Sequence, residues 1–263
     1  GTDGTIWGGE ILLADYENFT RFGSITPFLQ IGGDASAKEG WRIAVSMIYG
    51  YTKDREKAWE IIEKLGLCSE KESKVQFTMA DRKINAVMST SAGRLFDGVS
   101  AILGIRRKST FEGEASMALE FVAEEYQKNS LKNAKKMPEI PTYELLKEGN
   151  DRLLLNTGSL IKEILYRRLN GEDSDRLAYI FHQELARQIT ASCVKIREQS
   201  GCNKAALSGG VFQNRLLLEL TDHMLKQQGF EVLKHQLVPP NDGGIALGQA
   251  VYAMAYLDRN RNK

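Results

Sequence analysis

Hydrophobic and polar residues alternate near the start of the chain and then follow a helical spacing over most of its length. The alternation covers residues 5–31, which are rich in β-branched and aromatic side chains, and a polar break at 17–18 divides it. This pattern predicts a β-hairpin. We expect the hairpin to end at the glycines 32–33, and Asp34 or Ser36 to cap the helix that follows.

Apolar positions recur every three or four residues through most of the stretch 33–150. Such spacing places them on one face of an α-helix, so this region is predicted to be mostly helical. A polar connection with two prolines, residues 132–146, closes it. The four segments with the clearest helical spacing are 37–51, 54–67, 91–105 and 113–129.

Strand-like and helix-like segments alternate over residues 151–263. This order predicts an α/β unit with at least one parallel pair of strands. Gly201 is expected to cap the long helix that precedes it. After Gly201 the predicted elements are a strand over 204–210, a helix over 214–230, a strand over 231–238, a loop over 239–244 and a last helix over 245–257.

Composition excludes several classes of protein. The net charge is +1, which gives no general affinity for nucleic acid, and no apolar run reaches the ~20 residues that cross a bilayer. Cys68, Cys193 and Cys202 form neither a disulfide framework nor a thiolate metal motif, which favours a reducing cytoplasm. The chain begins without methionine in a glycine-rich turn, and we interpret it as a piece of a longer protein.

Four glycine doublets stand at 8–9, 32–33, 209–210 and 243–244, and three of them follow or join predicted strands. Between a strand and a helix, such a doublet aims backbone N–H groups at an anion, as in nucleotide-binding turns. The acidic neighbours Glu10 and Asp242 would serve if a divalent cation bridged them to a phosphate. Ordinary turn glycines are the alternative. Neither a P-loop nor a dinucleotide fingerprint is present.

Five motifs together resemble the HypF carbamoyltransferase family, in the family's order, from residue 3 to about 256. They are DGTIWGGE, SAGRLFDGVSAILG, FEGEASMALE, ALSGGVFQNRLLLE and PPNDGGIALGQA. The resemblance implies an α/β fold, a ribonuclease-H-like lobe of the acetate-kinase, sugar-kinase and actin-like architecture with a large helical insertion. The chain would be the second lobe, with a hairpin region (1–32), the insertion (33–150) and a nucleotide-binding part (151–263). The first lobe and the upstream domains would lie outside it.

The resemblance also implies a reaction. The family uses carbamoyl phosphate and ATP, through carbamoyl adenylate, to carbamoylate the C-terminal cysteine of a HypE-type protein. That step begins cyanide-ligand synthesis for [NiFe]-hydrogenases. Without the first lobe, the 263 residues are expected to be inactive. The alternatives are a nucleotide-binding lobe of a sugar-kinase-like enzyme, a related O-carbamoyltransferase, or a binding module without catalysis.

On the same resemblance, Gly209, Gly210 and Asn214 would lie at the adenosine of the nucleotide. Asp97 and Glu114 would accept hydrogen bonds from the ribose hydroxyls. Alternatively, Gly209 and Gly210 form an ordinary turn and Asn214 caps the helix that follows. Asp97 and Glu114 could instead be solvated carboxylates on helices.

Arg94 would contact the carbamoyl or phosphate group, unless it only pairs with Asp97 one turn away. Glu10 would face a phosphate or a partner loop. Asp242 matches a metal-ligand carboxylate of the family, or else it is an acid favoured by a helix N-terminus. The family's other metal ligands, two histidines in an H-x-x-x-H helix and an aspartate, are missing from this chain, so a divalent metal is doubtful here. His182 is expected to be structural, and the motifs assign no catalytic residue.

Overall fold

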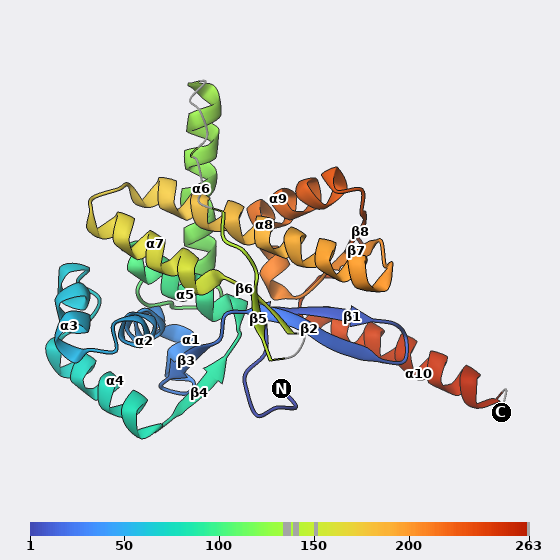
Figure 1. The fold of residues 1–263 in the computed structure, drawn as a ribbon, viewed down its shortest axis with the longest axis horizontal. Helices are drawn as coiled ribbons and strands as arrows, with labels where there is room; N and C mark the ends of the chain where they lie inside the picture. The colour runs from blue at the N-terminus through green and yellow to red at the C-terminus, as the bar shows by residue number, and fades with distance from the viewer. Residues whose placement is uncertain (134–137, 139–141, 150–151, 262–263) are drawn as a thin grey trace.

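The computed structural model describes residues 1–133, 138, 142–149 and 152–261. Figure 1 shows a central sheet with a helical region on one side and a smaller strand-and-helix region on the other. The strands are β1 (Glu10–Ala14), β2 (Phe19–Ile25), β3 (Phe28–Ile31), β4 (Ala86–Ser89), β5 (Leu146–Glu148), β6 (Arg152–Leu155), β7 (Lys204–Leu207) and β8 (Glu231–Lys234). The helices are α1 (Ala35–Lys38), α2 (Gly40–Thr52), α3 (Arg55–Lys64), α4 (Glu70–Arg82), α5 (Ala92–Ile102), α6 (Glu114–Lys132), α7 (Thr157–Leu169), α8 (Ser174–Ser200), α9 (Arg215–Gln227) and α10 (Ile245–Arg261), with 3-10 turns η1 (Gly210–Gln213) and η2 (Asp242–Gly244).

The central sheet has the strand order β1-β2-β6-β5. The predicted hairpin is confirmed, because β1 and β2 pair antiparallel and Asp15 Oδ1 accepts hydrogen bonds from the N–H groups of Glu17 and Asn18 in the turn. Strand β6 joins β2 in parallel, with Gly23 opposite Leu153. The hairpin is shorter than predicted: β3 leaves this sheet and pairs antiparallel with β4 in a sheet of two strands.

The helical region differs from the prediction at β4, at β5 and at the start of α1. Strand β4 was not predicted, because four residues between two helices carry too little periodicity to distinguish a strand from a helix. Neither predicted cap holds its helix: Asp34 makes no side-chain capping bond, and Ser36 lies inside α1, where its Oγ donates to the Gly33 carbonyl. Glu39 then separates α1 from α2.

The C-terminal region follows the predicted order. Strands β7 and β8 pair in parallel, with Ala205 opposite Val232, and β8 ends at Lys234 rather than 238. Gly201 ends α8 in the left-handed conformation, with φ of 72°, as predicted. The predicted connection 132–146 lies partly outside the described residues.

The main hydrophobic core lies where α2, α5, α6 and α8 pack on one another. Phe96 of α5 packs edge-to-face against Phe181 of α8, with ring centroids 4.8 Å apart. His182 is fully buried beside them, which confirms its structural placement. Within the described ranges, no helix combines the length and apolar character needed to cross a membrane.

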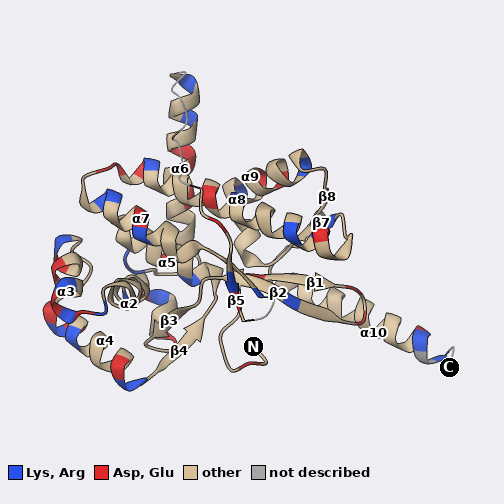
Figure 2. Cartoon of the chain, in the orientation of Figure 1, with Lys and Arg blue, Asp and Glu red and all other residues tan. Residues whose placement is uncertain are grey.

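Helix α10 extends away from the rest of the molecule in Figure 1, and Arg259 near its C-terminal end pairs with Glu17 in the turn between β1 and β2. Acidic and basic residues are intermingled over the other helices, whereas α10 is uncharged over most of its length (Figure 2). Its exposed large apolar residues are Ile245, Leu247, Val251, Tyr252, Met254, Tyr256 and Leu257.

Candidate nucleotide site around α5

The start of α5 is joined to the segment that carries the first glycine doublet. The Thr90 N–H donates to the Ile6 carbonyl at 2.8 Å, and the Ala92 N–H donates to the Gly8 carbonyl at 3.2 Å. Two predicted site motifs that lie more than 80 residues apart in the sequence, WGGE (7–10) and GRLFD (93–97), therefore meet at the N-terminus of one helix.

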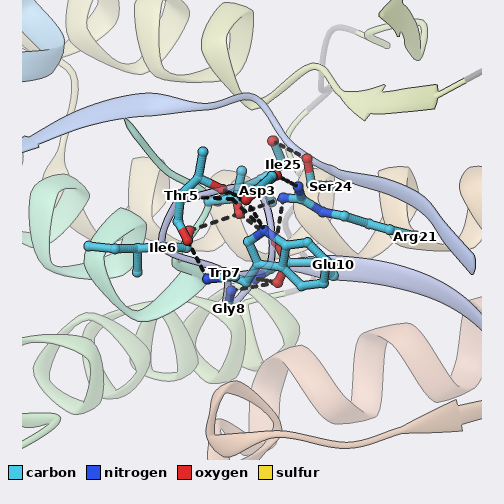
Figure 3. Close-up of polar contacts among 12 residues, drawn as sticks. Asp3, Thr5, Ile6, Trp7, Gly8, Glu10, Arg21, Ser24 and Ile25 are labelled. Atoms are coloured by element: carbon cyan, nitrogen blue, oxygen red, sulfur yellow. Dashed lines mark hydrogen bonds and ion pairs between the residues drawn. The ribbon is translucent and has the colours of Figure 1, made fainter. Parts of the chain in front are cut away.

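Glu10 points into this junction rather than away from it (Figure 3). One carboxylate oxygen accepts hydrogen bonds from the backbone N–H groups of Gly8 and Gly9, the latter at 2.8 Å. The other oxygen pairs with Arg21 Nη2 at 2.9 Å and accepts from the Thr90 hydroxyl. The Glu10 side chain is only 8% exposed. The carboxylate predicted to meet a ligand is thus bound by its own chain.

Arg94 forms the ion pair with Asp97 that was its alternative interpretation, whereas Asp97 is buried and is not the solvated carboxylate that was its alternative. Arg94 Nη2 lies 2.8 Å from Asp97 Oδ2, although the angle does not make a hydrogen bond, and neither this oxygen nor Arg94 Nε has a hydrogen-bond partner among the described residues. Burial raises the pKa of Asp97 to about 6, and the Arg94 guanidinium opposes part of that rise. Asp97 Oδ2 therefore has an unused acceptor position, and a hydroxyl group is one kind of donor that could fill it.

The doublet Gly209-Gly210 lies at the exposed turn between β7 and η1. Gly209 has φ of +96°, and no described atom lies within 4 Å of where its Cβ would be. Its N–H is already used, since it donates to the Pro240 carbonyl at 2.8 Å. The turn therefore offers an open backbone surface, but its first N–H group is not available to an anion.

Asn214 caps α9, as the capping alternative predicted. Its Oδ1 accepts from the Leu217 N–H at 2.8 Å, and its Nδ2 lies 3.0 Å from His182 Nε2. His182 Nδ1 faces the Ala178 carbonyl at 2.8 Å, so Nδ1 carries the proton and Nε2 accepts from Asn214. Burial lowers the pKa of His182 to about 4, which keeps the imidazole neutral. Asn214 thereby ties the turn to the buried face of α8.

Glu120 of α6 is a residue that the motifs did not indicate. It accepts from the N–H of Arg215 at 2.6 Å and more weakly from the N–H of Leu216. Burial raises its pKa, and these backbone donors oppose the rise. With Asn214, it gives the N–H groups at the start of α9 acceptors within the chain, so these N–H groups are not free to meet a phosphate.

Helix α5 contacts both η1 and α6. It therefore lies between the WGGE segment and the open turn at Gly209-Gly210, and Arg94 and Asp97 are on the helix that joins them. A cavity of about 560 Å³ lies between β3, α2 and α7; α5 contributes Leu95 to its wall, but none of the predicted site residues lines it.

Comparison with known proteins identifies the family. The profile for "carbamoyltransferase, Kae1-like domain, second subdomain" matches residues 1–249. The chain belongs to the HypF carbamoyltransferase family. It is 34% identical over 260 residues to the probable carbamoyltransferase HypF of Methanocaldococcus jannaschii, covering 99% of this chain and 32% of that protein. To the HypF of Rhodobacter capsulatus it is 36% identical, covering 99% and 31%.

The fold agrees with the same family. A crystal structure of full-length HypF in the phosphate- and nucleotide-bound form superposes with a TM-score of 0.85 at 34% identity, covering 98% of this chain and 32% of that one. This confirms the predicted α/β, ribonuclease-H-like fold. The chain spans about a third of the length of the relatives that it matches.

The remaining two residues expected from the HypF resemblance lie apart from this junction. Glu114 begins α6 and accepts from the Thr110 N–H, which is the main cause that lowers its pKa; it also pairs with Arg106 at 3.2 Å. Asp242 is exposed at the start of η2. In the part of the chain that the structure describes, no group of three or more His, Cys, Asp or Glu side chains could hold a metal. The described residues do not fit a metal site on their own.

Proposed function

We propose that this chain is the nucleotide-binding second subdomain of a HypF-type carbamoyltransferase. The complete enzyme would use ATP and carbamoyl phosphate, through carbamoyl adenylate, to carbamoylate the C-terminal cysteine of a HypE-type protein. The family membership and the nucleotide-bound form of a related full-length HypF support this proposal. The observation that carries it is the open turn at Gly209-Gly210 beside the helix that bears Asp97.

The chemistry of this proposal assigns a distinct task to each part. The bare backbone of Gly209 and Gly210 would lie against the adenosine, because a side chain there would occupy the ligand's space. Asp97 Oδ2 would accept a hydrogen bond from a ribose hydroxyl. Arg94, with a buried guanidinium N–H still without an acceptor, would bind the phosphoryl or carbamoyl oxygen.

The transfer step itself would take place at the carbamoyl carbon of the adenylate. The cysteine thiolate of the partner would attack this carbon, a C–S bond would form, and the C–O bond to the phosphate would break, releasing AMP. Nothing in this step requires oxidation or reduction. The acceptor cysteine belongs to the partner, and we assign no catalytic residue in the described part of this chain.

Titration calorimetry with AMP tests the nucleotide assignment. Gly210 has no positive φ, and the nearest atom to its Cβ position, Gln213 Oε1, is 3.8 Å away. A Gly210→Val variant should therefore fold normally while weakening AMP by tenfold or more, and Asp97→Ala should weaken it similarly. Gly50→Ala, in an open position of α2, is the control that leaves AMP binding unchanged. Equal AMP affinity in all four proteins would contradict the assignment.

A further inference from the structure

Four hydrogen-bond donors converge on the Glu10 carboxylate, and they come from three separate parts of the chain. Two are the N–H groups of Gly8 and Gly9, one is the Arg21 guanidinium on β2, and one is the Thr90 hydroxyl just before α5. Two adjacent backbone N–H groups that point at one anion form the kind of concave site that binds phosphate in other proteins. Here the bound anion is a side chain of the same protein.

Arg21 binds the Glu10 carboxylate and a second carboxylate at the same time. One of its terminal nitrogens binds Glu10 and the other binds Asp3 Oδ2 at 2.7 Å, and its guanidinium lies 4.1 Å from the centre of the Trp7 ring. The Arg21 side chain is 10% exposed. A two-pronged contact of this kind suits arginine and not lysine, because only the planar fork can bind both carboxylates at once.

The glycines are required here by a close approach of two backbones. A Cβ on Gly9 would lie 2.6 Å from the Thr90 carbonyl oxygen, and one on Gly8 would lie 3.1 Å from Ser91 Cα. Both contacts are with the segment that begins α5. The first doublet therefore presses against α5, whereas the Gly209-Gly210 turn opens away from its neighbours.

We propose that Glu10 permanently fills the amide site of Gly8 and Gly9, and that Arg21 positions it there. The doublet then fastens the N-terminus of α5, and with it Arg94, instead of binding a phosphate of the ligand. Displacing Glu10 would break four hydrogen bonds, and it would leave Arg21 Nη2 with only the Thr90 hydroxyl as an acceptor among the described residues, beside an Arg21 Nε that already has none. This inference concerns the free chain and stands independently of which nucleotide the protein binds.

Hydrogen exchange of backbone amides, measured by NMR on the 263-residue chain labelled at glycine and alanine, tests the positioning role. The Ala92 amide reports directly, because it donates to the Gly8 carbonyl. Arg21→Ala and Glu10→Ala should each speed exchange at Gly9 and Ala92 by tenfold or more. Arg21→Lys should recover only part of the protection. Arg55→Ala, which removes an exposed pair with Asp81, is the matched control and should change neither amide.

Chemical rescue separates an anion site from a general loss of stability. In Glu10→Ala, added acetate should fill the vacated position and restore protection at Gly9 and Ala92 several-fold, while acetate should not affect Arg21→Ala. Should Glu10→Ala not fold, Glu10→Gln gives the same test without rescue, through faster exchange at Gly9.

Adding inorganic phosphate to the unaltered chain is a further test of the proposal. The Gly8 and Gly9 signals of the unaltered chain should not move when phosphate is added, whatever happens at Gly210. A saturable phosphate shift at Gly8 and Gly9 would show that Glu10 is displaced by ligands, and would overturn the proposal. Unchanged Ala92 exchange in Arg21→Ala would also overturn it.

Discussion

Replacing Asp97 with asparagine should flatten the dependence of folding stability on pH. Asp97 is only 3% exposed, and burial raises the pKa of its carboxyl from 3.8 to about 6. Between these two values the carboxyl is protonated in the folded chain and ionised in the unfolded chain. The folded state therefore binds more protons, and its stability falls as pH rises through this window.

The size of the effect follows from the shift. Slightly more than two pH units correspond to about 3 kcal/mol lost between acid and neutral pH, at about 1.4 kcal/mol per unit. About half of this loss falls between pH 5.0 and 7.5, where the chain can be studied without acid unfolding. Asparagine has nearly the same shape and no proton to lose, so the stability difference between the two proteins should change by about 1.4 kcal/mol over that range.

Urea denaturation at pH 5.0, 6.0 and 7.5, followed by circular dichroism, measures this difference. Asp81→Asn is the control: its carboxylate is exposed, and Arg55 is the main cause that lowers its pKa, so it is ionised in both states throughout this range. The free energy of unfolding of Asp81→Asn should change with pH by the same amount as that of the unaltered chain. If the free energy of unfolding of Asp97→Asn also changes with pH as that of the unaltered chain does, the burial argument is refuted and Asp97 ionises normally.

Four shorter predictions follow from the same geometry. Gly9→Ala should cost about 2 kcal/mol in urea denaturation, because its Cβ would lie 2.6 Å from the Thr90 oxygen, whereas Gly50→Ala in open space on α2 should gain up to about 1 kcal/mol. Asn214→Ala should lower the free energy of unfolding by at least about 1 kcal/mol through the lost cap, with more from the unsatisfied histidine beside it; a change under half that would contradict the cap. If Asp97 accepts ribose hydroxyls only when ionised, AMP should bind about tenfold more weakly at pH 5 than at pH 7, and the Asp97→Asn variant should lose this dependence. The 263 residues alone should transfer no carbamoyl group to a peptide with the C-terminal cysteine of a HypE-type protein; turnover measured by mass spectrometry would refute this.

Elements with a clear periodicity or clear flanking turns could be predicted from the sequence, and short elements without either could not. Helix α5 was expected over residues 91–105 and begins after Ser91, which accepts a capping bond from the Arg94 N–H. The parallel pairing of β7 and β8 followed from the order of strands and helices. Strand β4 depends on its pairing with β3, which no local pattern of four residues reveals. The same limit explains why Ser36, a good capping residue, lies inside α1.

The site was predicted less completely, because much of it consists of contacts between distant segments. Arg94 and Asp97 could be placed together, since they are one helical turn apart. Arg21 and Glu120 carry no motif of their own; each matters because tertiary packing brings it to a backbone or carboxylate group far away in the sequence. What marks Arg21 and Glu120 is that each is a charged residue in a largely buried position, and this burial is visible only in the structure.

The four glycine doublets show why motif spacing alone cannot assign a ligand site. In the sequence, three of the four follow or join predicted strands, and nothing in their spacing shows which of these brings N–H groups to an anion. In the structure, Gly9 has a backbone oxygen where its Cβ would be, whereas no described atom lies near that of Gly209. Gly9 is required by the fold itself, whereas Gly209 leaves space that a ligand can use. Because the positive φ of Gly209 strains any replacement, Gly210 is the position where loss of AMP binding separates a role in the ligand site from a role in the fold.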